Sequence, residues 1–264
     1  MPAALIRRTG PLVFGLLLAA FGTFAAAQAQ KAAGAYEPQS GQAGKDVVWV
    51  PTPQALVDKM LDMAKVTPND FVMDLGSGDG RTVITAAKRG ARALGIEYNP
   101  DMVALSRRNA EKEGVAGKAT FVKADLFQTD FSRASVITMF LLPSINLKLR
   151  PKILALKPGT RIVSNSFTMD DWEADETANL GPESGCTSFC NAYFWLVPAN
   201  VAGTHALPQG ELTLKQQFQA LSGSLRTEGK TFALEGKVRG EEITFTAGGR
   251  KYIGKMNGKS LELR

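Results

Sequence analysis

Residues 72–80 read Val72-Met73-Asp74-Leu75-Gly76-Ser77-Gly78-Asp79-Gly80, and this stretch decides the fold. The apolar residues before the glycines predict a short buried strand over residues 70–75, and residues 82–88 begin a helix. A glycine-rich turn between a strand and a helix lets a ligand approach the backbone closely, at the carboxyl end of the strand. Taken alone, such a turn is a weak indication of a binding site.

The alternation of strands and helices continues on both sides of this turn. Pro53 opens a helix whose apolar residues recur at helical spacing, and Asn99-Pro100 caps another that runs to about residue 113. Further strands are predicted at residues 92–97, 119–124, 135–141 and 159–167, and a further helix at residues 143–156. Strands joined by helices imply right-handed crossovers. Residues 47–201 therefore predict an α/β fold with a doubly wound, mostly parallel, Rossmann-like sheet.

The pattern changes after about Ala202, where short strands alternate with glycine-containing turns. The dipeptides Gly248-Gly249 and Asn257-Gly258 suit tight hairpins. Strands are predicted at residues 212–218, 224–226, 232–234, 237–238, 243–246, 252–253 and 260–263. We expect residues 202–264 to form a small antiparallel β meander, too small and too polar for a large core, that packs on the main domain.

The first 29 residues have the three-part plan of a secretory signal peptide. Arg7 and Arg8 precede an apolar core at residues 11–21, and Ala27-Gln28-Ala29 fits a cleavage site. This order predicts cleavage and export to the periplasm or the exterior, with no stable membrane span in the mature protein. An uncleaved membrane anchor and organelle targeting are the alternatives. Residues 30–46 have the composition of a flexible linker.

The net charge of +6 is compatible with a nucleic-acid partner, so the location of the charges along the chain decides this question. Residues 30–200 hold 19 basic and 19 acidic side chains, whereas residues 201–264 hold 10 and 6. The excess lies in the leader and the tail, so the central region has no electrostatic footprint for a phosphate backbone. We therefore expect no nucleic-acid partner.

The metal-ligating residue types are scarce. His205 is the single histidine, and the chain has two cysteines, Cys186 and Cys190. Sites that need two imidazoles or four thiolates are excluded, and no metal is predicted. The two cysteines can form a disulfide in an exported protein, or remain as free buried thiols; the sequence leaves both possibilities open.

Two carboxylates at the ends of later strands sharpen the meaning of the glycine turn. Glu97 ends the second strand and can accept hydrogen bonds from both hydroxyls of a ribose. Asp125 follows the third strand and can accept from an adenine amino group, while Tyr98 and Leu126 can flank the ring. Three successive strand ends thus predict a site for an adenine nucleoside.

The residues of the turn discriminate between the cofactors that contain this nucleoside. A pyrophosphate binder uses the spacing G-x-G-x-x-G, whereas the glycines here are spaced G-x-G-x-G. Asp74 and Asp79 place carboxylates beside the turn, which repel a pyrophosphate but suit a ligand with an ammonium and a sulfonium. We therefore favour S-adenosylmethionine (SAM) as the cofactor over NAD.

At this point the sequence resembles the class I SAM-dependent methyltransferases. More narrowly, it is similar to the lysine N-methyltransferases of the ATP synthase c-subunit and the adenine nucleotide translocase, and to their bacterial relatives. The resemblance covers residues 47–175, but not the leader or the meander. It is carried by Val50-Pro51-Thr52-Pro53, Asp74-Leu75-Gly76-Ser77-Gly78-Asp79-Gly80-Arg81, Gly95-Ile96-Glu97, Asp125-Leu126-Phe127, Leu141-Leu142-Pro143, Leu156-Lys157-Pro158-Gly159-Thr160-Arg161 and Trp172.

The resemblance implies a set of site residues and a reaction. The cofactor-binding residues expected are Asp74, Gly76, Ser77, Gly78, Gly80, Glu97, Tyr98, Asp125 and Leu126. The reaction expected is methyl transfer to a protein lysine, and the candidates for the acceptor side are Phe140, Asp170 and Trp172. No general base is evident, and the oligomeric state is not predicted.

Two other functions fit the same residues. A methyltransferase acting on an oxygen or nitrogen of a small molecule would need an enclosed acceptor pocket. The second alternative is an exported nucleoside-binding protein without catalysis. SAM is made in the cytosol, so an exported enzyme would have to obtain its cofactor elsewhere.

Overall fold

The structure is a computed structural model that describes Met1 and residues 36–208, 210–257 and 260–263. Residues 37–264 form one compact unit. The predicted signal peptide and the first part of the predicted linker lie outside the described residues, apart from Met1. Within the described ranges, no helix combines the length and the apolar character that a bilayer crossing requires.

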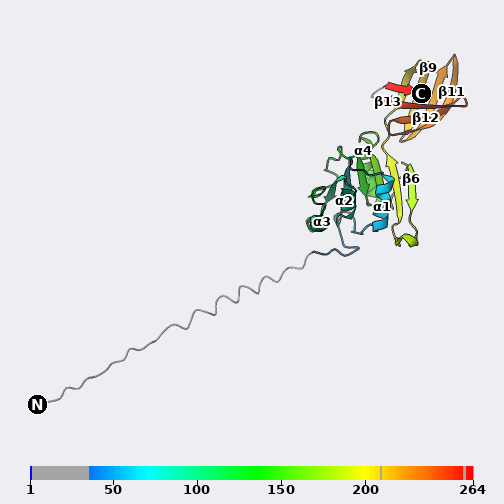
Figure 1. Cartoon of the computed structure of the whole chain (residues 1–264). Coiled ribbons are helices and arrows are strands. Elements are labelled where there is room, and N and C mark those ends of the chain that lie inside the picture. The colour runs from blue at the N-terminus through cyan, green and yellow to red at the C-terminus, as the bar shows by residue number, and fades with distance from the viewer. Residues whose placement is uncertain (2–35, 209, 258–259, 264) are drawn as a thin grey trace. The chain divides into compact units, whose positions relative to one another are not determined.

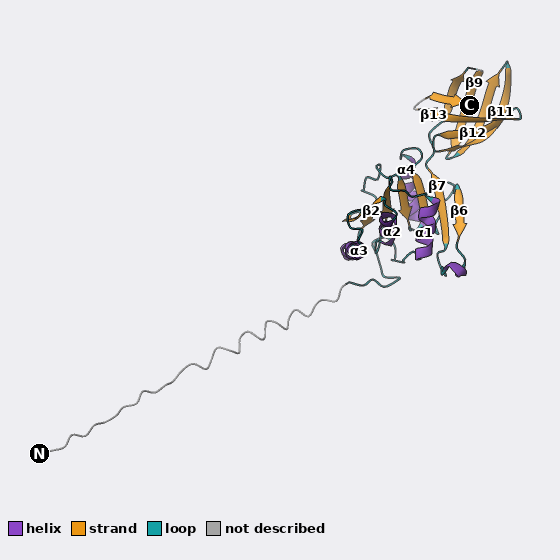
Figure 2. Ribbon diagram, in the orientation of Figure 1, coloured by secondary structure: helices purple, strands orange, loops and turns teal. Residues whose placement is uncertain are grey.

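The first half of the compact unit is built on a mixed β-sheet with helices on both faces (Figures 1 and 2). Over the described residues its order is β3-β2-β1-β4-β5-β7-β6. The strands β1 to β5 run parallel, while β7 is antiparallel to both β5 and β6. This sheet confirms the predicted doubly wound fold. The strands are β1 (Phe71–Leu75), β2 (Arg92–Glu97), β3 (Ala119–Lys123), β4 (Val136–Met139), β5 (Arg161–Asn165), β6 (Glu176–Asn179) and β7 (Asn191–Leu196).

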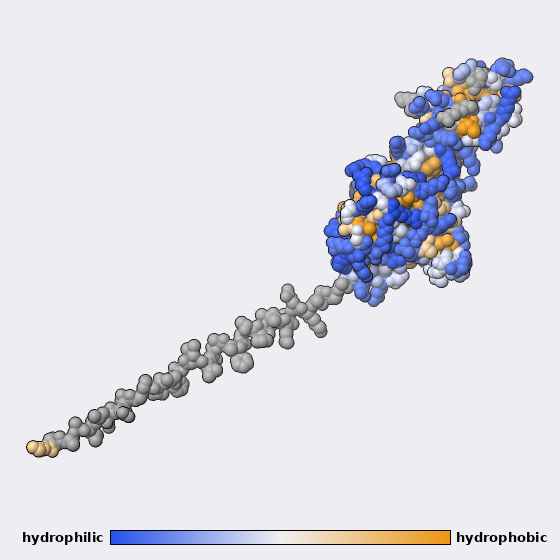
Figure 3. Space-filling model, in the orientation of Figure 1, coloured by the Kyte–Doolittle hydropathy of each residue, from blue (hydrophilic) through white to orange (hydrophobic). Residues whose placement is uncertain are grey.

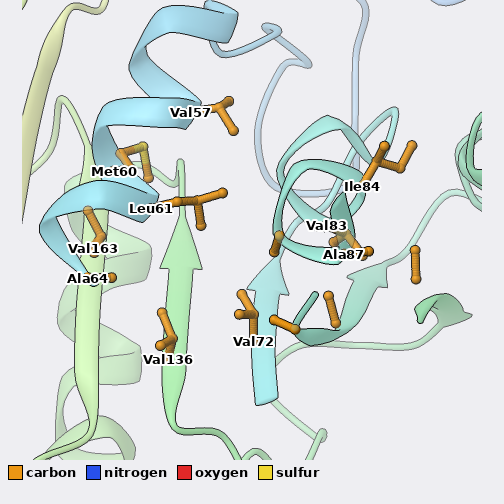
Figure 4. Packing of buried hydrophobic residues seen from close by; sticks show 14 of the residues in the cluster. Val57, Met60, Leu61, Ala64, Val72, Val83, Ile84, Ala87, Val136 and Val163 are labelled. Carbon is orange, nitrogen blue, oxygen red and sulfur yellow. The ribbon is translucent and has the colours of Figure 1, made fainter. Parts of the chain in front are cut away.

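Helices α1 (Gln54–Met63), α2 (Arg81–Lys88) and α3 (Pro100–Lys112) bury their apolar stripes in one cluster with strand residues. Figure 4 shows this packing, with Leu61 of α1 and Val83 of α2 beside Val72 and Val136 of the sheet. Helix α4 (Pro143–Leu154) packs in a separate cluster with other residues of the same strands. Because the strands are covered on both faces, their carboxyl ends form the edge at which a ligand can bind.

The second half of the unit is an antiparallel sheet with the order β14-β13-β12-β11-β10-β9-β8. Strand β14 also lies against β8, so the predicted meander curls into a barrel-like sheet. The strands are β8 (Gly203–Leu207), β9 (Gly210–Gln217), β10 (Ala220–Thr227), β11 (Lys230–Arg239), β12 (Glu242–Ala247), β13 (Arg250–Asn257) and β14 (Ser260–Leu263). Strand β8 was not predicted, and the two pieces predicted at 232–234 and 237–238 are one strand.

The expectation that this meander lacks a sizeable core is wrong. Leu212, Leu225, Ile243 and Phe245 are almost completely buried, in a cluster that belongs to these strands. Apolar residues that alternate with polar ones all point inward when the sheet curls, so a composition that is polar on average still fills an interior. In the view of Figure 3, most of the surface over the two sheets is hydrophilic.

The predicted hairpin at Gly248-Gly249 is present. Both glycines have positive φ angles, +56° and +78°, and Ala247 pairs with Arg250 across the turn. Gly258, in the second predicted hairpin, lies outside the described residues.

The meander also contacts the main domain, as predicted. The ring of Phe218 stacks on Trp172 with 5.9 Å between ring centroids. Gln219 Nε2 donates a hydrogen bond to the carbonyl of Glu173 over 2.8 Å.

Candidate functional site

The turn from β1 to α2 needs glycine for packing as well as for backbone conformation. Gly76, Gly78 and Gly80 have φ angles of +80°, +53° and +85°, in the region that L side chains rarely adopt. A Cβ atom on Gly80 would lie 2.8 Å from the ring of Phe121, and one on Gly78 would lie 2.6 Å from the indole nitrogen of Trp49. These glycines therefore bring the turn close to its neighbours, as the spacing predicts.

Hydrogen bonds hold this turn while one of its side chains stays unpaired. The amides of Gly76 and Ser77 donate to the carbonyl of Ile96, and Ser106 Oγ donates to the carbonyl of Gly78 over 2.8 Å. Ser77 Oγ is buried and has no partner within the described residues. An orphaned buried hydroxyl is unfavourable unless a ligand supplies its partner.

A cavity of about 520 Å³ opens beside this turn, at the carboxyl ends of β1, β2, β3 and β4. Its walls include eight of the nine predicted cofactor residues: Asp74, Gly76, Ser77, Gly78, Glu97, Tyr98, Asp125 and Leu126. Gly80 is the exception, since it precedes the first residue of α2 and packs against Phe121 instead. The tertiary structure thus collects residues from three strand ends in one cavity.

Glu97 is held in place by two backbone amides. Its Oε2 accepts from Gly78 N and its Oε1 accepts from Asn99 N, both over 2.9 Å. Each carboxylate oxygen keeps a lone pair for a further hydrogen bond. The side chain is therefore oriented to accept from the two neighbouring hydroxyls of a ribose.

Asp74 is a buried carboxyl group on the cavity wall. It is 6% exposed, and its Oδ1 accepts from Thr138 Oγ1 of the neighbouring strand β4 over 2.6 Å. Burial raises the pKa of Asp74 to about 7, although the Thr138 hydrogen bond works against this; the charges of Glu97 and Asp79 raise the pKa further. A cationic ligand would relieve this penalty by pairing with the ionised form.

The structure changes the interpretation of Asp79. Its carboxylate forms hydrogen bonds to the Arg81 guanidinium, the shortest over 2.6 Å, and Arg81 also donates to the carbonyl of Thr52. Asp79 is therefore largely neutralised by its own neighbour. Asp74 is left as the carboxyl group best placed to receive a cofactor ammonium.

A segment predicted to be a linker forms part of the cavity wall. Trp49 N donates to the carbonyl of Gln42, and Gly41 N donates to the carbonyl of Trp49, around a turn in which Ala43 bridges to Val48. This hairpin places Lys45 Nζ 2.6 Å from Asp125 Oδ2 and 4.6 Å from the centroid of the Tyr98 ring. Through this hydrogen bond the pair lowers the pKa of Asp125 and raises the pKa of Lys45.

Sequence reasoning missed these wall residues because they lie far from the strand ends along the chain. The described part of residues 30–46 is not a plain flexible linker, and the missed residues Lys45 and Trp49 come from it and from the segment directly after it. The low-complexity composition gave no signal for either residue.

Comparison with known proteins identifies the family to which this fold belongs. Residues 74–176 match the family model described as the ANTKMT methyltransferase domain. The chain is 47% identical, over 137 residues, to a protein-lysine N-methyltransferase of Saccharolobus islandicus, in an alignment that covers 51% of this chain and 85% of that protein. The chain belongs to this family of SAM-dependent methyltransferases.

Two further relatives show how far the likeness extends. The human lysine N-methyltransferase of the ATP synthase c-subunit is 36% identical over 134 residues, which are 50% of this chain and 57% of that protein. A solved structure from Salinibacter ruber, titled an RNA methyltransferase in complex with S-adenosyl-L-homocysteine, is 45% identical with a TM-score of 0.53. That alignment covers 58% of this chain and 96% of the other. All three likenesses span only about half of this methyltransferase.

SAM is the cofactor of this methyltransferase, and the cavity residues fit it. Ser77 Oγ offers an unpaired buried hydroxyl, Glu97 offers a fixed carboxylate that can accept from ribose hydroxyls, and Asp74 offers a carboxyl group for the ammonium. The Asp125 side chain, which the sequence assigns to the adenine amino group, is paired with Lys45. An adenine amino group that binds there would displace Lys45 from the Asp125 carboxylate or share the carboxylate with it.

The acceptor side differs from the sequence prediction. Phe140 lines the cavity, as expected, together with Phe167 and Phe189. Trp172 does not, because it is fully buried between Trp195 and Phe218, with ring centroids 6.1 and 5.9 Å away. An aromatic residue after a strand can pack into the core as readily as line a site, and here the turn that pairs Met169 with Trp172 folds it inward.

Asp170 is also outside the cavity wall. Its side chain is exposed and its φ angle is +59°. Asp170 and Trp172 are therefore corrected as acceptor-side candidates: neither lines the cavity, whereas Phe140 does, together with Phe167 and Phe189.

Cys186 and Cys190 form a disulfide, which resolves the alternatives left open by the sequence. The bridge closes a short loop after the 3₁₀ turn Pro182–Ser184, between β6 and β7. Phe189 lies inside this loop and reaches the cavity wall. Neither Phe167 nor Phe189 belongs to a motif that the sequence analysis singled out.

Proposed function

We propose that this protein transfers the methyl group of SAM to the side-chain amine of a lysine in a protein. The observation that carries the proposal is the likeness to a protein-lysine N-methyltransferase over 85% of that relative's length. The cavity supports it, because the wall next to the predicted cofactor residues is built from apolar and aromatic side chains: Phe140, Leu141, Ile145, Phe167 and Phe189.

Methyl transfer requires little from the protein beyond positioning the two reactants and excluding water from them. When bound, SAM supplies an electrophilic methyl group. A lysine amine must arrive neutral to attack it, and an apolar wall favours the neutral form by lowering the amine's pKa. The carboxyl groups of Asp74 and Glu97 orient the cofactor, so that the enzyme supplies proximity and alignment. The proton of the methylated amine leaves to water.

An RNA acceptor is the second candidate, because the solved relative from Salinibacter ruber is titled an RNA methyltransferase. The equal numbers of basic and acidic side chains over residues 30–200 favour a protein acceptor instead. A small-molecule acceptor remains the third candidate, and the test below separates all three.

The test incubates the purified protein and an extract of its native host with methyl-labelled SAM, with a Glu97→Ala variant as control. Label in protein, recovered as methylated lysine by mass spectrometry and absent with the variant, supports the proposal. Label that nuclease releases, or label only in small molecules, would replace it with the second or third candidate. No transfer to any acceptor would leave a SAM-binding protein without catalysis.

We also propose that the protein is exported, with residues 1–29 removed. The order of Arg7-Arg8, apolar core and Ala27-Gln28-Ala29 supports this. The disulfide between Cys186 and Cys190 fits an oxidising compartment. N-terminal sequencing of protein from the native host should begin near residue 30, whereas a retained Met1 in a membrane fraction would point to an anchor.

A further inference from the structure

Three phenylalanine rings meet on the acceptor side of the cavity. Phe140 directly follows β4, Phe167 lies two residues after β5, and Phe189 comes from the disulfide loop before β7. The ring centroids are 6.0 Å apart for Phe140 and Phe167, 5.2 Å for Phe140 and Phe189, and 6.3 Å for Phe167 and Phe189. We call these three residues the phenylalanine trio; all three line the cavity that also holds Asp74.

The trio is held in place by backbone conformations that phenylalanine and its neighbours rarely adopt. Phe189 has a φ angle of +56°, and Ser166, next to Phe167, has +59°. Such angles are outliers for bulky residues and persist only when the surrounding structure enforces them. For Phe167 that structure includes Ser164 Oγ, which donates to its carbonyl over 2.7 Å; for Phe189 it is the closed loop.

The exposure of Phe189 is difficult to explain by packing alone. Its side chain is 41% exposed, although the described core buries most of the large apolar residues. A ring left exposed at a cavity wall, beside two others, is available to a ligand. Aromatic faces attract cations whose charge lies within about 6 Å of the ring centroid, and alkylated ammonium groups in particular.

We propose that Phe189 completes, with Phe140 and Phe167, an aromatic site for the methylated ammonium of the acceptor, and thereby favours repeated methylation of one amine. The inference rests on the proposed function. Each methyl group added to a lysine amine increases its apolar surface, so the partly methylated side chain binds the trio better than the unmodified one. An acceptor that is retained in this way can lose its proton to water and be methylated again once S-adenosyl-L-homocysteine has been replaced by a second SAM.

The disulfide is the positioning element of this site. It ties Cys186 to Cys190, the residue next to Phe189, and so limits the conformations that the loop can sample. Reduction by an external dithiol, which is itself oxidised to a disulfide, leaves two free thiols and removes this limit. The site should then weaken without any change in the cofactor residues.

The first experiment measures binding of tetramethylammonium to the S-adenosyl-L-homocysteine-loaded protein, and is independent of turnover. We expect Phe189→Ala and Phe189→Leu to weaken binding by about 3- to 30-fold, whereas Phe189→Trp retains it. The leucine variant separates the aromatic face from apolar volume. Ile253→Ala in β13 is the matched control, because Ile253 is also 41% exposed but lies outside the trio. Equal binding in all variants would overturn the proposal.

The second experiment compares the products formed from a lysine acceptor by mass spectrometry. We expect wild type to accumulate di- and trimethyl-lysine, and Phe189→Leu to release mainly monomethyl-lysine with SAM affinity unchanged. Pretreatment with dithiol, or the double variant Cys186→Ser with Cys190→Ser, should shift the products in the same direction. An unchanged product distribution in the Phe189 variants would refute the proposal, and one unchanged after reduction would refute the role of the loop.

The two experiments also separate this inference from the function on which it rests. If wild type methylates no lysine but binds tetramethylammonium in a manner that depends on Phe189, the proposed acceptor is wrong and the ammonium site stands. If wild type methylates lysine while tetramethylammonium binding does not depend on Phe189, the proposed function stands and this inference is wrong.

Discussion

Replacing Asp74 by asparagine keeps the shape of the side chain and removes its titration. Asp74 is 6% exposed and has a pKa of about 7, mainly because of burial. In the unfolded chain an aspartate has a pKa of about 3.9. The folded, cofactor-free protein therefore keeps a proton that the unfolded chain has already lost.

The sign of the effect on stability follows from this difference. Because the native state binds more protons over this range, the free energy of unfolding of the cofactor-free protein falls as the pH rises from about 4 to about 7, and then levels off. At 1.36 kcal/mol for each pH unit, the whole loss is roughly 4 kcal/mol. Asp74→Asn lacks this loss, so its stability relative to wild type should rise by roughly 2 kcal/mol between about pH 5 and pH 7.

The affinity for the cofactor should depend on pH in the opposite direction. The ammonium of SAM pairs best with an ionised carboxylate, so binding to wild type must release the proton of Asp74. Affinity should rise by up to about tenfold for each pH unit between pH 5 and pH 7. At neutral pH the asparagine variant should bind about 10- to 150-fold more weakly, since a charge-assisted hydrogen bond contributes about 1.5–3 kcal/mol.

Two measurements test this reasoning. Chemical denaturation gives the unfolding free energy across the pH range, and titration calorimetry in buffers of different ionisation enthalpy gives the affinity and the protons released. A wild-type affinity that does not change between pH 5 and pH 7, or equal affinities for wild type and variant at neutral pH, would show that Asp74 is not the partner of the ammonium.

Asp70→Asn is the matched control, at the residue before β1. Burial acts to raise the pKa of Asp70, but the hydrogen bonds from Arg161, Thr67 and Ser135, with the charge of Arg161, together outweigh burial and hold that pKa below its usual range. Its stabilising effect is therefore complete above the pH at which an unfolded aspartate titrates, and is lost only as the pH falls through the lower folded pKa. Between pH 5 and pH 7 the control should lower stability by a constant amount and leave the pH dependence of SAM affinity unchanged.

Three further changes are predicted. Glu97→Ala should weaken SAM binding about 100-fold or more in calorimetry, through loss of two ribose hydrogen bonds, and unchanged affinity would remove Glu97 from the site. Gly80→Ala should lower stability by about 1–3 kcal/mol in denaturation, because its Cβ would lie 2.8 Å from the ring of Phe121; a neutral effect would contradict the packing. Phe218→Ala should lower the melting temperature by removing the stack on Trp172, and an unchanged melt would mean that this contact carries little stability.

The cofactor half of the site could be predicted because its residues occupy fixed places on a regular pattern. Glu97 ends one strand and Asp125 follows another, and parallel strands bring their carboxyl ends to a common edge. Once the strands are located, the neighbourhood of these side chains follows. The same logic located Phe140 after β4.

The acceptor half could not be predicted in the same way. Phe189 lies in an irregular loop, so no periodicity connects it to the cavity. Lys45, on the cofactor side beside Asp125, was missed for a similar reason, because it lies in a segment of low complexity. Trp172 follows a strand as Phe140 does, yet it turns into the core. Strand β6 was missed because it is short and mostly exposed, without the alternating pattern of a half-buried strand.

The sequence by itself determined the succession of parallel strands, the glycine turn and the positions of the carboxyl groups predicted to bind SAM. Each of these depends on local geometry repeated along the chain: buried strands, capped helices, and glycines where φ is positive. Only the tertiary structure decided the burial of Trp172, the closing of the meander around its own core and the meeting of Phe140, Phe167 and Phe189. Each of these features depends on which residues, distant along the chain, are buried together. Only packing in three dimensions determines this.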